Sequence, residues 1–536
     1  MSVVQQELQR EIRRRRTFAI ISHPDAGKTT LTEKLLLYGG AIRLAGSVKA
    51  RKAQKHAVSD WMEIEKQRGI SVTSSVMQFE YNGYCINILD TPGHQDFSED
   101  TYRTLMAADS AVMIIDSAKG VEEQTRKLFH VCKMRGIPIF TFINKMDRAG
   151  KDPFELVEEI EKVLGIQSYP MNWPIRIGGS FLGVYNRKLS QVELFNGGDH
   201  GQSIVASTIK KVDDKVFTDL LGEDAHNKLT EDIMLLDMAG DEFSRRKILK
   251  GELTPVFFGS AMTNFGVQVF LEEFLELTSP PLPRNADIGE IDAESERFSG
   301  FIFKIQANMN PTHRDRIAFL RICSGKFTKG MEVNHVQGGR MVRLSQPQQF
   351  LAQDREIVEE AYAGDIIGVF DPGIFRIGDT LCEGEAFRFE GIPVFAPEHF
   401  ARVFAKNSLK RKQFMKGIEQ ISEEGAIQVF KKQDSMAQEF IIGVVGVLQL
   451  EVLEYRLKNE YGVDINVDQL PYKYIRWIEK PELDLRSLKT TSDTLIVRDQ
   501  FENPVLLFQN EWSIRTVIER NNGIELAEMR AAALTA

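Results

Sequence analysis

The sequence has few cysteines and no long hydrophobic run, and these absences exclude several classes of protein. Its 536 residues include four widely spaced cysteines that form no Cys-x-x-Cys pair and no cluster with histidine. Such usage favours a reducing compartment and gives no sign of structural zinc. The longest apolar runs, such as GIPIFTFI, are far too short to span a membrane, and the N-terminus lacks the apolar segment of a secretory signal. We therefore expect a cytoplasmic protein with no membrane partner.

The sequence also lacks low-complexity tracts and any excess of positive charge. Its net charge of −9 argues against non-specific binding of nucleic acid over the whole surface, although local basic surfaces stay compatible with it. The cluster from 13 to 16, four arginines, is interpreted as the solvated end of a first helix in preference to an RNA contact. A chain of this length exceeds one hydrophobic core, so we expect three or more domains.

Short apolar segments alternate with helix-length segments between residues 17 and 150. TFAII, YCINILD, SAVMIID and IPIFTFIN are nearly all apolar, which is typical of parallel strands covered on both faces. Residues 151–254 interrupt this pattern, and PVFFGSA resumes it at 255–261. The sequence therefore predicts an α/β domain over residues 1–280, with an inserted subdomain at about 151–254 and ligands at the carboxyl ends of its strands.

Two further domains are predicted after the proline-rich break TSPPLPRN at 278–285. Residues 285–392 contain short alternating segments separated by glycine turns, a pattern typical of an all-β barrel. Residues 393–536 mix helical and strand signals, which favours an α+β domain of two layers.

The stretch SHPDAGKT, residues 22–29, follows the first predicted strand and opens a helix. It ends in Gly27, Lys28 and Thr29 as a phosphate loop does, but Ser22 stands where that pattern has its first glycine. A helix N-terminus offers N–H groups and a partial positive charge to phosphates; Lys28 would reach the β- and γ-phosphates and Thr29 would ligate Mg²⁺. A chance helix start that reads GKT is the less favoured alternative.

The stretch DTPGH, residues 90–94, ends the strand YCINILD about 60 residues after the phosphate loop. Asp90 is placed to hold Mg²⁺ through water, and the amide of Gly93 to face a γ-phosphate. A simple turn is the alternative. His94 follows directly and is interpreted as the residue that orients the attacking water, in preference to a merely structural histidine.

The stretch NKMD, residues 144–147, ends the strand IPIFTFI and indicates guanine as the base. Asp147 can accept both N1–H and the N2 amino group of guanine, a pairing that adenine does not offer. Asn144 would bridge loops beside the base, and the stem of Lys145 would pack over the purine. GSA at 259–261 adds a backbone amide for guanine O6.

The stretch RGIS, residues 68–71, is predicted to be a switch that orders around Mg²⁺ when a γ-phosphate is present. Within this stretch, the hydroxyl of Ser71 would be the ligand of Mg²⁺. The preceding loop is basic, and two explanations of this composition are equally good: contact with RNA phosphates, or a solvated switch loop. Its basic residues are Arg43, Lys49, Arg51, Lys52 and Lys55.

Taken together, SHPDAGKT, SDWMEIEKQRGIS, DTPGH, NKMD and GSA resemble the motifs of the ribosome-associated translational GTPases of the elongation factor G-like group. The resemblance is strongest to the bacterial peptide chain release factor 3 family and covers essentially the whole chain, including GVVGVLQLEVL in the third domain. It implies a ribosome-stimulated GTPase that converts GTP to GDP and promotes departure of the class I release factor after peptide release. Mg²⁺ is the implied cofactor, the ribosome and that factor are the implied partners, and we expect a monomer.

The resemblance also assigns residues to roles. The implied nucleotide-binding residues are Ser22, His23, Pro24, Asp25, Ala26, Gly27, Lys28, Thr29, Thr30, Asp90, Thr91, Pro92, Gly93, His94, Asn144, Lys145, Met146, Asp147, Ser260 and Ala261. The implied catalytic residues are His94, Asp25 and Lys28. The implied metal ligands are Thr29, Ser71 and Asp90. The implied switch residues are Arg68, Gly69, Ile70 and Ser71.

The chain departs from the family pattern at two of these positions. Pro24, which with Ile70 would flank His94 as an apolar gate, replaces a branched aliphatic residue that many relatives carry. Ser71 replaces the commoner threonine but keeps the hydroxyl that would ligate Mg²⁺.

Three alternative functions have weaker support. A translocase of the elongation factor G type would continue into two further C-terminal domains, for which a chain of 536 residues has no room. A GTP-binding docking module with little hydrolysis is disfavoured by His94 and Ser71. A P-loop ATPase or kinase is disfavoured by NKMD.

Overall fold

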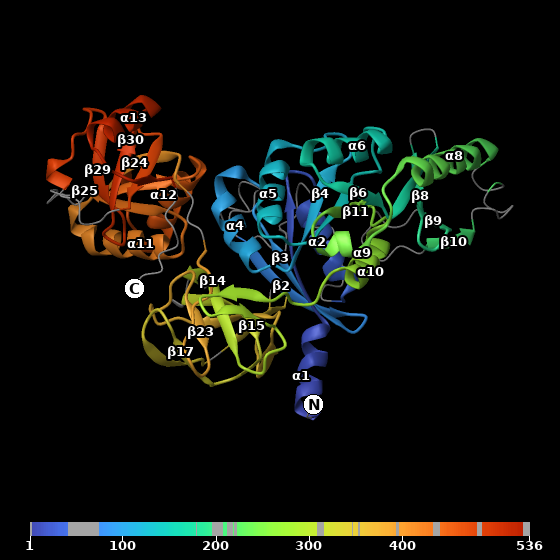
Figure 1. The fold of residues 1–536 in the computed structure, drawn as a ribbon, viewed down its shortest axis with the longest axis horizontal. Coiled ribbons are helices and arrows are strands. Elements are labelled where there is room, and N and C mark those ends of the chain that lie inside the picture. Colours follow the sequence, from blue (N-terminus) through green and yellow to red (C-terminus); the bar gives the residue numbers. More distant parts are fainter. Residues whose placement is uncertain are drawn as a thin grey trace.

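The protein is described by a computed structural model, in which the chain forms three bodies (Figure 1). The structure describes residues 3–40, 74–177, 180–195, 207–211, 218, 222–307, 316–345, 347–351, 354–392, 396–432, 440–479 and 485–528. Within these ranges, no helix is long and apolar enough to cross a membrane.

The first domain is built on a sheet of seven strands in the order β2-β3-β1-β4-β5-β11-β6. Six strands are parallel, and β2 is antiparallel to β3 at one edge. The strands are β1 (Arg15–Ser22), β2 (Ser75–Tyr81), β3 (Tyr84–Asp90), β4 (Ser110–Asp116), β5 (Ile139–Asn144), β6 (Gln167–Pro170) and β11 (Leu253–Phe258).

Helices cover both faces of this sheet, as its nearly all-apolar strands require. One face packs against α2, α9 and α10, and the other against α4, α5 and α6. These helices are α2 (Lys28–Tyr38), α4 (Ser98–Met106), α5 (Glu123–Met134), α6 (Pro153–Leu164), α9 (Arg245–Leu249) and α10 (Val267–Leu277); the short helix η2 (Gln95–Phe97) precedes α4. The predicted α/β domain is confirmed.

A second, antiparallel sheet extends the first domain on the side away from the C-terminal domain (Figure 1). It consists of β7 (Asn172–Ile177), β8 (Ser180–Asn186), β9 (Gln191–Phe195) and β10 (Ser207–Lys211), accompanied by α8 (Glu223–Ala239).

The predicted insertion, residues 151–254, includes elements of the main sheet. Helix α6 packs on that sheet, and β6 pairs in parallel with β11 at its edge. The additional sheet therefore begins at Asn172. The sequence pattern does not identify β6 as a strand of the main sheet, because β6 is short, ends in Pro170 and lies at an edge.

The second body is an antiparallel barrel-like domain, as predicted. Its main sheet has the order β18-β17-β23-β14-β15-β22-β19-β20, with β16 and β21 paired beside it. Helix α1 (Val3–Arg13) packs Leu8 and Ile12 into the core of this domain, although the sequence suggested that the N-terminus belongs to the first domain. The strands are β14 (Ser299–Ala307), β15 (Arg316–Ser324), β16 (Lys326–Thr328), β17 (Glu332–His335), β18 (Arg340–Arg343), β19 (Gln348–Leu351), β20 (Asp354–Ile357), β21 (Glu360–Tyr362), β22 (Ile366–Phe370) and β23 (Thr380–Cys382); the hairpin β12 (Arg284–Ala286) and β13 (Gly289–Ile291) precedes them.

The C-terminal domain confirms the predicted α+β architecture and consists of two halves that share one sheet. The sheet has the order β27-β24-β26-β25-β29-β30-β28-β31, and β25 joins the halves by pairing with both β26 and β29. Helices α11 and α12 cover the first half, and α13 packs on the second. The elements are β24 (His399–Ala405), η3 (Ser408–Lys410), α11 (Arg411–Glu423), β25 (Gln428–Lys432), β26 (Phe440–Val444), α12 (Leu448–Tyr461), β27 (Ile465–Leu470), β28 (Tyr474–Ile478), η4 (Leu485–Ser487), β29 (Thr494–Arg498), β30 (Pro504–Phe508), α13 (Glu511–Arg520) and β31 (Leu526–Ala527).

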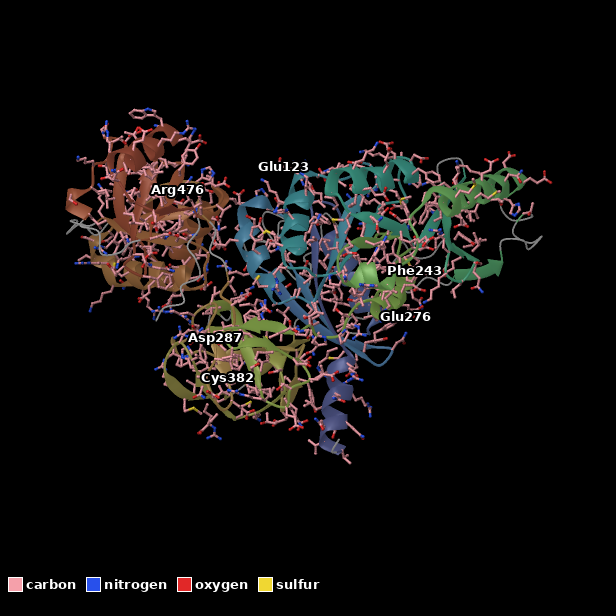
Figure 2. The ribbon with its side chains drawn as sticks, viewed as in Figure 1. Glu123, Phe243, Glu276, Asp287, Cys382 and Arg476 are labelled. Atoms are coloured by element: carbon pink, nitrogen blue, oxygen red, sulfur yellow. The ribbon has the colours of Figure 1, made fainter. Side chains whose placement is uncertain are left out.

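All four cysteines are free and buried. Cys382 lies within the barrel-like domain (Figure 2). Burial raises the pKa of Cys85 and of Cys132 to about 12, so both thiols stay protonated near neutral pH.

Buried ion pairs join the first domain to the barrel-like domain. Arg15 on β1 lies 2.7 Å from a carboxylate oxygen of Asp365, and Arg321 on β15 lies 2.5 Å from one of Asp109. Because each pair is nearly removed from water, losing either partner would leave a costly buried charge. These pairs hold the two domains in one orientation.

Candidate functional site

The phosphate loop connects β1 to α2 through two residues in the left-handed backbone region. Asp25 has a φ of 65° and Gly27 a φ of 101°. A Cβ atom on Gly27 would lie only 2.2 Å from Nδ2 of Asn144, so glycine is required both by the backbone and by the close approach. No side chain caps the start of α2, which leaves its first N–H groups available to an anion.

Lys28 lies at the start of α2 and is directed to the end of β3. Its Nζ donates to Asp90 Oδ1 at 2.9 Å and also to the backbone oxygen of Thr91. Both Lys28 and Asp90 are buried. The pair brings the two motifs together across about 60 residues of sequence, as expected for neighbouring parallel strands.

The donor set near Asp90 fits a divalent cation. The Oδ2 atom of Asp90 is buried and has no hydrogen-bond partner in the described part of the chain. Among the same residues, no three His, Cys, Asp or Glu side chains form a closed metal site. A single buried carboxylate oxygen without a partner is what a Mg²⁺ site requires, because protein side chains hold Mg²⁺ through one or two carboxylates while phosphates and waters supply the other ligands.

The DTPGH stretch lies against the phosphate loop. Thr91 Oγ1 donates to the backbone oxygen of Ile20 at 2.7 Å, and a Cβ atom on Gly93 would lie 3.6 Å from Cα of Pro24. The amide of Gly93 is therefore close to the loop that would hold the phosphates.

His94 has its own hydrogen-bond environment. Its Nδ1 lies 3.2 Å from Asp96 Oδ1 and accepts a hydrogen bond from the Asp96 N–H at 3.3 Å. The side chain is 34% exposed. In the described ranges, the imidazole makes no hydrogen bond to Lys28 or Asp90.

Asn144 links the phosphate loop to the GSA loop. Its Nδ2 donates to the backbone oxygen of Ala26 at 2.8 Å, while its Oδ1 accepts from the N–H of Ala261 at 2.8 Å. The side chain is buried, so both polar ends are satisfied within the protein.

Lys145 has a φ of 68°, and its Nζ reaches across the end of the sheet. It donates to the backbone oxygen of Asp25 at 2.5 Å and to Asp116 Oδ2 at 2.7 Å. Burial acts to raise the pKa of Asp116, but hydrogen bonds from Lys145 and from the Ala118 N–H outweigh it, and the pKa is lowered. Asp116 therefore remains charged and fixes Lys145.

The sequence interpretation missed Asp116, although a signal for it was present. This residue ends β4, the strand SAVMIID, at the same sheet edge as the other motifs. A lone aspartate at the end of a strand between two assigned strands was the available clue.

Asp147 is held by the GSA loop. Ser260 Oγ donates to Asp147 Oδ1 at 2.5 Å, and Met146 N–H donates to the backbone oxygen of Gly259 at 3.1 Å. This contact leaves the Asp147 carboxylate partly exposed beside the loop.

The structure does not bring every predicted residue to the surface of the site. Met146 is fully buried in the core under the sheet. Ser22 is buried as well, and its hydroxyl has no hydrogen-bond partner among the described residues. His23 instead faces Glu122, with its Nε2 at 3.1 Å from a carboxylate oxygen.

Several predicted residues lie outside the ranges that the structure describes. They are the switch residues Arg68, Gly69, Ile70 and Ser71, and the basic residues Arg43, Lys49, Arg51, Lys52 and Lys55.

A parallel sheet with a phosphate loop, joined at its edge to an Asn-Lys-x-Asp loop and followed by a barrel, defines a multi-domain GTPase of the translation-factor class. Family models agree along the chain. Residues 13–280 match the elongation factor Tu GTP binding domain, and residues 297–384 match elongation factor G domain 2. Residues 389–518 match the C-terminal domain of class II release factor RF3.

Relatives identify the family within that class. The chain is 64% identical to peptide chain release factor 3 of Symbiobacterium thermophilum over 96% of this chain and 97% of that one. It is 54% identical to peptide chain release factor 3 of Listeria monocytogenes over 98% and 99% of the two chains. The chain belongs to the peptide chain release factor 3 family and is a GTPase of translation termination.

A solved structure supports the fold. A crystal structure of a protein from Thermus thermophilus matches 90% of this chain and 72% of its own, with a TM-score of 0.69 and 22% identity. At that identity the likeness bears on the fold alone.

Proposed function

We propose that this chain binds the ribosome after peptide release, hydrolyses GTP there, and promotes dissociation of class I release factors so that they can be used again. Membership of the release factor 3 family supports this proposal. The observation that carries the GTP-dependent part is the connection of Asn144 and Lys145 to the phosphate loop. We further propose that the chain acts as a cytoplasmic monomer.

Guanine recognition falls to the loop between β5 and α6. Asp147 accepts N1–H and the N2 amino group of guanine while Ser260 holds its other face in place. Lys145 packs its stem over the purine, and the Ala261 amide, aligned by Asn144, faces O6. An adenine base would leave the carboxylate without its two donors, so binding of ATP would be weak.

The phosphates lie over the start of α2. Asp25, Gly27, Thr29 and Thr30 present their backbone N–H groups, and Lys28 leaves Asp90 to contact the β- and γ-phosphates. Thr29, Ser71 and Asp90 would hold Mg²⁺, and the unpartnered Oδ2 of Asp90 supports this assignment. When bound, Mg²⁺ neutralises charge that builds on the phosphates.

Hydrolysis depends on a water that His94 orients. The imidazole lies next to Gly93, whose amide faces the γ-phosphate, and it is partly exposed. Pro24 would form the apolar boundary on one side, and Ile70, which lies outside the described ranges, would form it on the other. The imidazole must leave its contacts with the backbone N–H and the carboxylate of Asp96 to reach the water, which makes stimulation by the ribosome necessary for rapid turnover.

The test of the hydrolysis mechanism is ribosome-stimulated turnover of GTP by His94→Ala, with GDP affinity measured in parallel. Turnover should fall by about 10²–10⁴-fold, the usual contribution of a positioned proton-transfer or water-orienting group, with little change in GDP affinity. Turnover near that of the unmodified chain, with nucleotide binding intact, would show that another residue orients the water.

The test of the cellular role uses post-release ribosomes that carry a labelled class I release factor. Addition of the chain with GTP should accelerate loss of the label, and a non-hydrolysable analogue separates binding from turnover. Unchanged dissociation of the labelled factor would contradict the proposal even if GTP turnover were normal.

A further inference from the structure

Helix α12 of the C-terminal domain is capped by a residue of the first domain. The N–H of Leu448, its first residue, donates to Asp96 Oδ2 at 2.8 Å. Val447 supplies no side-chain cap, and Gln449 turns its own Oε1 to the N–H groups of Val445 and Gly446. Asp96 therefore satisfies a donor that would otherwise lack a partner at the domain boundary, and its charge suits the helix N-terminus.

The other oxygen of the same carboxylate faces His94. Asp96 Oδ1 lies 3.2 Å from His94 Nδ1, and the Asp96 N–H donates to that nitrogen at 3.3 Å. One residue, Asp96, thus contacts both His94, through its backbone N–H and Oδ1, and the first turn of α12, which lies about 350 residues further along the chain.

The fit between Asp96 and α12 depends on a glycine. A Cβ atom on Gly446 would lie 2.0 Å from Cγ of Asp96 and 2.4 Å from its Oδ2. The three atoms nearest to this added Cβ belong to the Asp96 side chain, so any larger residue at 446 must displace this side chain. Gly446 does not have a positive φ, and alanine therefore suits its backbone.

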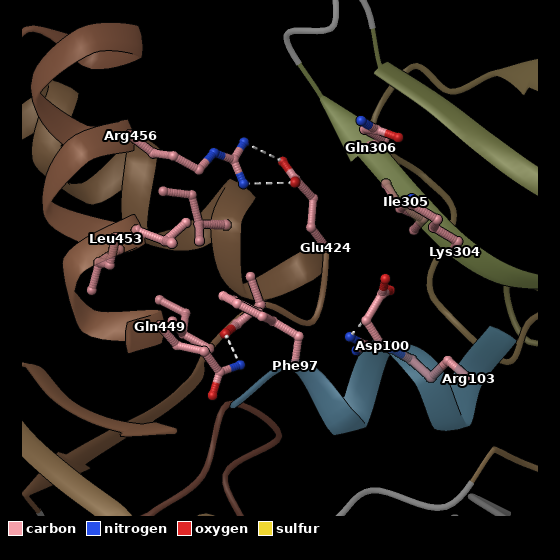
Figure 3. Close-up of a pocket in the computed structure, with 14 residues that line it drawn as sticks. Phe97, Asp100, Arg103, Lys304, Ile305, Gln306, Glu424, Gln449, Leu453 and Arg456 are labelled. Atoms are coloured by element: carbon pink, nitrogen blue, oxygen red, sulfur yellow. Dashed lines mark hydrogen bonds and ion pairs between the residues drawn. The ribbon is translucent and has the colours of Figure 1, made fainter. Parts of the chain in front are cut away.

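A second contact from the C-terminal domain lies seven residues, about two helical turns, further along. Both terminal guanidinium nitrogens of Arg103, on α4, donate to the backbone oxygen of Gly425 at 3.1 Å. Figure 3 shows Phe97, the last residue of η2, directed toward Gln449 and Leu453 of α12, with Arg103 on α4, which follows η2. The C-terminal domain thus contacts the segment that follows His94, at Asp96 and at Arg103.

We propose that Asp96 is a positioning residue through which the C-terminal domain holds His94 away from the nucleotide until that domain moves. In the described part of the chain, the polar groups in contact with the imidazole are the backbone N–H of Asp96, which donates to Nδ1, and the Asp96 carboxylate, 3.2 Å from the same nitrogen. Displacement of α12 takes the Leu448 N–H away from Asp96 Oδ2, so the Asp96 side chain and the backbone that carries it can shift, and His94 becomes free to turn toward the γ-phosphate. This inference rests on the proposed role of His94 in hydrolysis, and the experiment below separates the two.

The experiment places Gly446→Ala in the full chain and records NMR spectra of ¹³C-labelled histidine, with the His94 signal assigned by its loss in His94→Gln. The new methyl group should displace Asp96 and shift the His94 ring signal, whereas the signals of the other eight histidines should stay in place. Val447→Ala is the matched control, because this neighbouring residue is 40% exposed and its side chain does not cap the helix. An unmoved His94 signal in Gly446→Ala would overturn the proposal.

Turnover in the absence of ribosomes gives the direction of the effect. Gly446→Ala should raise it about fivefold, with unchanged GDP affinity and no rise in Val447→Ala. Asp96→Ala should act in the same way, whereas Asp96→Asn, which keeps an acceptor for the Leu448 N–H, should remain closer to the unmodified chain. Unchanged or slower turnover in both Gly446→Ala and Asp96→Ala would overturn the claim that His94 is held away.

A different result would identify failure of the proposed function. If His94→Ala retains ribosome-stimulated turnover while Gly446→Ala still shifts the His94 signal, then the coupling stands and the role of His94 in hydrolysis is wrong.

Discussion

The base end of the nucleotide site is formed by residues 143–148 and 259–261. Here Asn144 and Lys145 hydrogen-bond to the phosphate loop within a single domain. At the hydrolysis end, His94 is joined through Asp96 to Leu448, at the start of a helix in another domain. The polar groups of the base end pair with one another within the protein. The hydrolysis end has its key side chains paired with groups that they must leave.

This difference separates affinity from turnover. A preformed base end lowers the cost of ordering the site when the nucleotide binds. A hydrolysis end that depends on a second domain allows a partner that moves this domain to control the chemical step. Changes within the base end should therefore alter affinity, and changes at the domain boundary should alter turnover or domain stability.

The largest effect should follow from Asp147→Asn, which exchanges a carboxylate that accepts two hydrogen bonds for an amide with one acceptor. GTP affinity should fall by roughly 10⁴-fold, because a buried donor of guanine then meets a donor. Xanthosine triphosphate, which carries an oxygen at that position, should bind better to the variant than GTP does. Competition binding against labelled GDP measures both, and retained GTP selectivity would remove Asp147 from the site.

The next effect concerns the C-terminal domain at its boundary with the barrel-like domain, where Glu424 also accepts from the Ala307 N–H at 3.3 Å. Arg456 is fully buried and contacts Glu424 through two hydrogen bonds of 2.8 and 3.0 Å (Figure 3). Arg456→Met leaves the buried Glu424 carboxylate without its charged partner, and the free energy of unfolding of this domain should fall by about 3–5 kcal/mol. Hydrogen exchange of the α12 amides in urea measures it.

The control for that variant is Arg402→Met, which removes an exposed ion pair with Asp468 in the same domain. Its expected cost is below about 1 kcal/mol. GDP affinity should be unchanged in both variants, since the base end lies within the first domain. A large loss of GDP affinity in Arg456→Met would contradict the separation of the two ends.

A smaller effect is expected from Gly27→Ala. The added Cβ would meet Nδ2 of Asn144 and force a side chain into the left-handed region. GDP affinity should fall about 100-fold, of the order of 3 kcal/mol. Gly136→Ala is the matched control because Gly136 has a φ of 64° and no atom within 4 Å of an added Cβ; it carries the backbone strain without the clash. Equal affinities in the two variants would show that the contact with Asn144 does not matter.

The smallest effect should come from Ser22→Gly, which restores the first glycine of the phosphate-loop pattern. The Ser22 hydroxyl is buried and has no hydrogen-bond partner among the described residues, so no interaction is lost. GDP affinity should stay within about threefold of the unmodified chain. A tenfold change measured by calorimetry would mean that the serine has a role in the loop.

The sequence was informative wherever function lies at the end of a buried strand. Asp90 and Asn144 could be predicted to meet the phosphate loop because their strands are nearly all apolar, and parallel strands bring their carboxyl ends to one edge. The barrel-like and C-terminal domains were likewise predicted from periodicity, since alternation and glycine turns are local signals.

Contacts between distant segments could not be predicted in this way. The hydrogen bond between Asp96 and Leu448 spans 352 positions, and no periodicity marks either residue. The packing of Leu8 in the barrel-like domain and the pairing of the short edge strand β6 depend on tertiary contacts that override local patterns. Such contacts arise from shape and charge at domain boundaries, which a single sequence does not display.

The dependence of the hydrolysis end on the C-terminal domain is tested most directly by hydrogen exchange in Gly446→Ala. Exchange of the backbone amides in residues 93–98 should accelerate about tenfold, because the Asp96 side chain loses its place between His94 and α12. Exchange in 143–148 and 259–261, the base end, should not change. Equal protection of 93–98 in the variant and the unmodified chain, or equal acceleration at both ends, would contradict it.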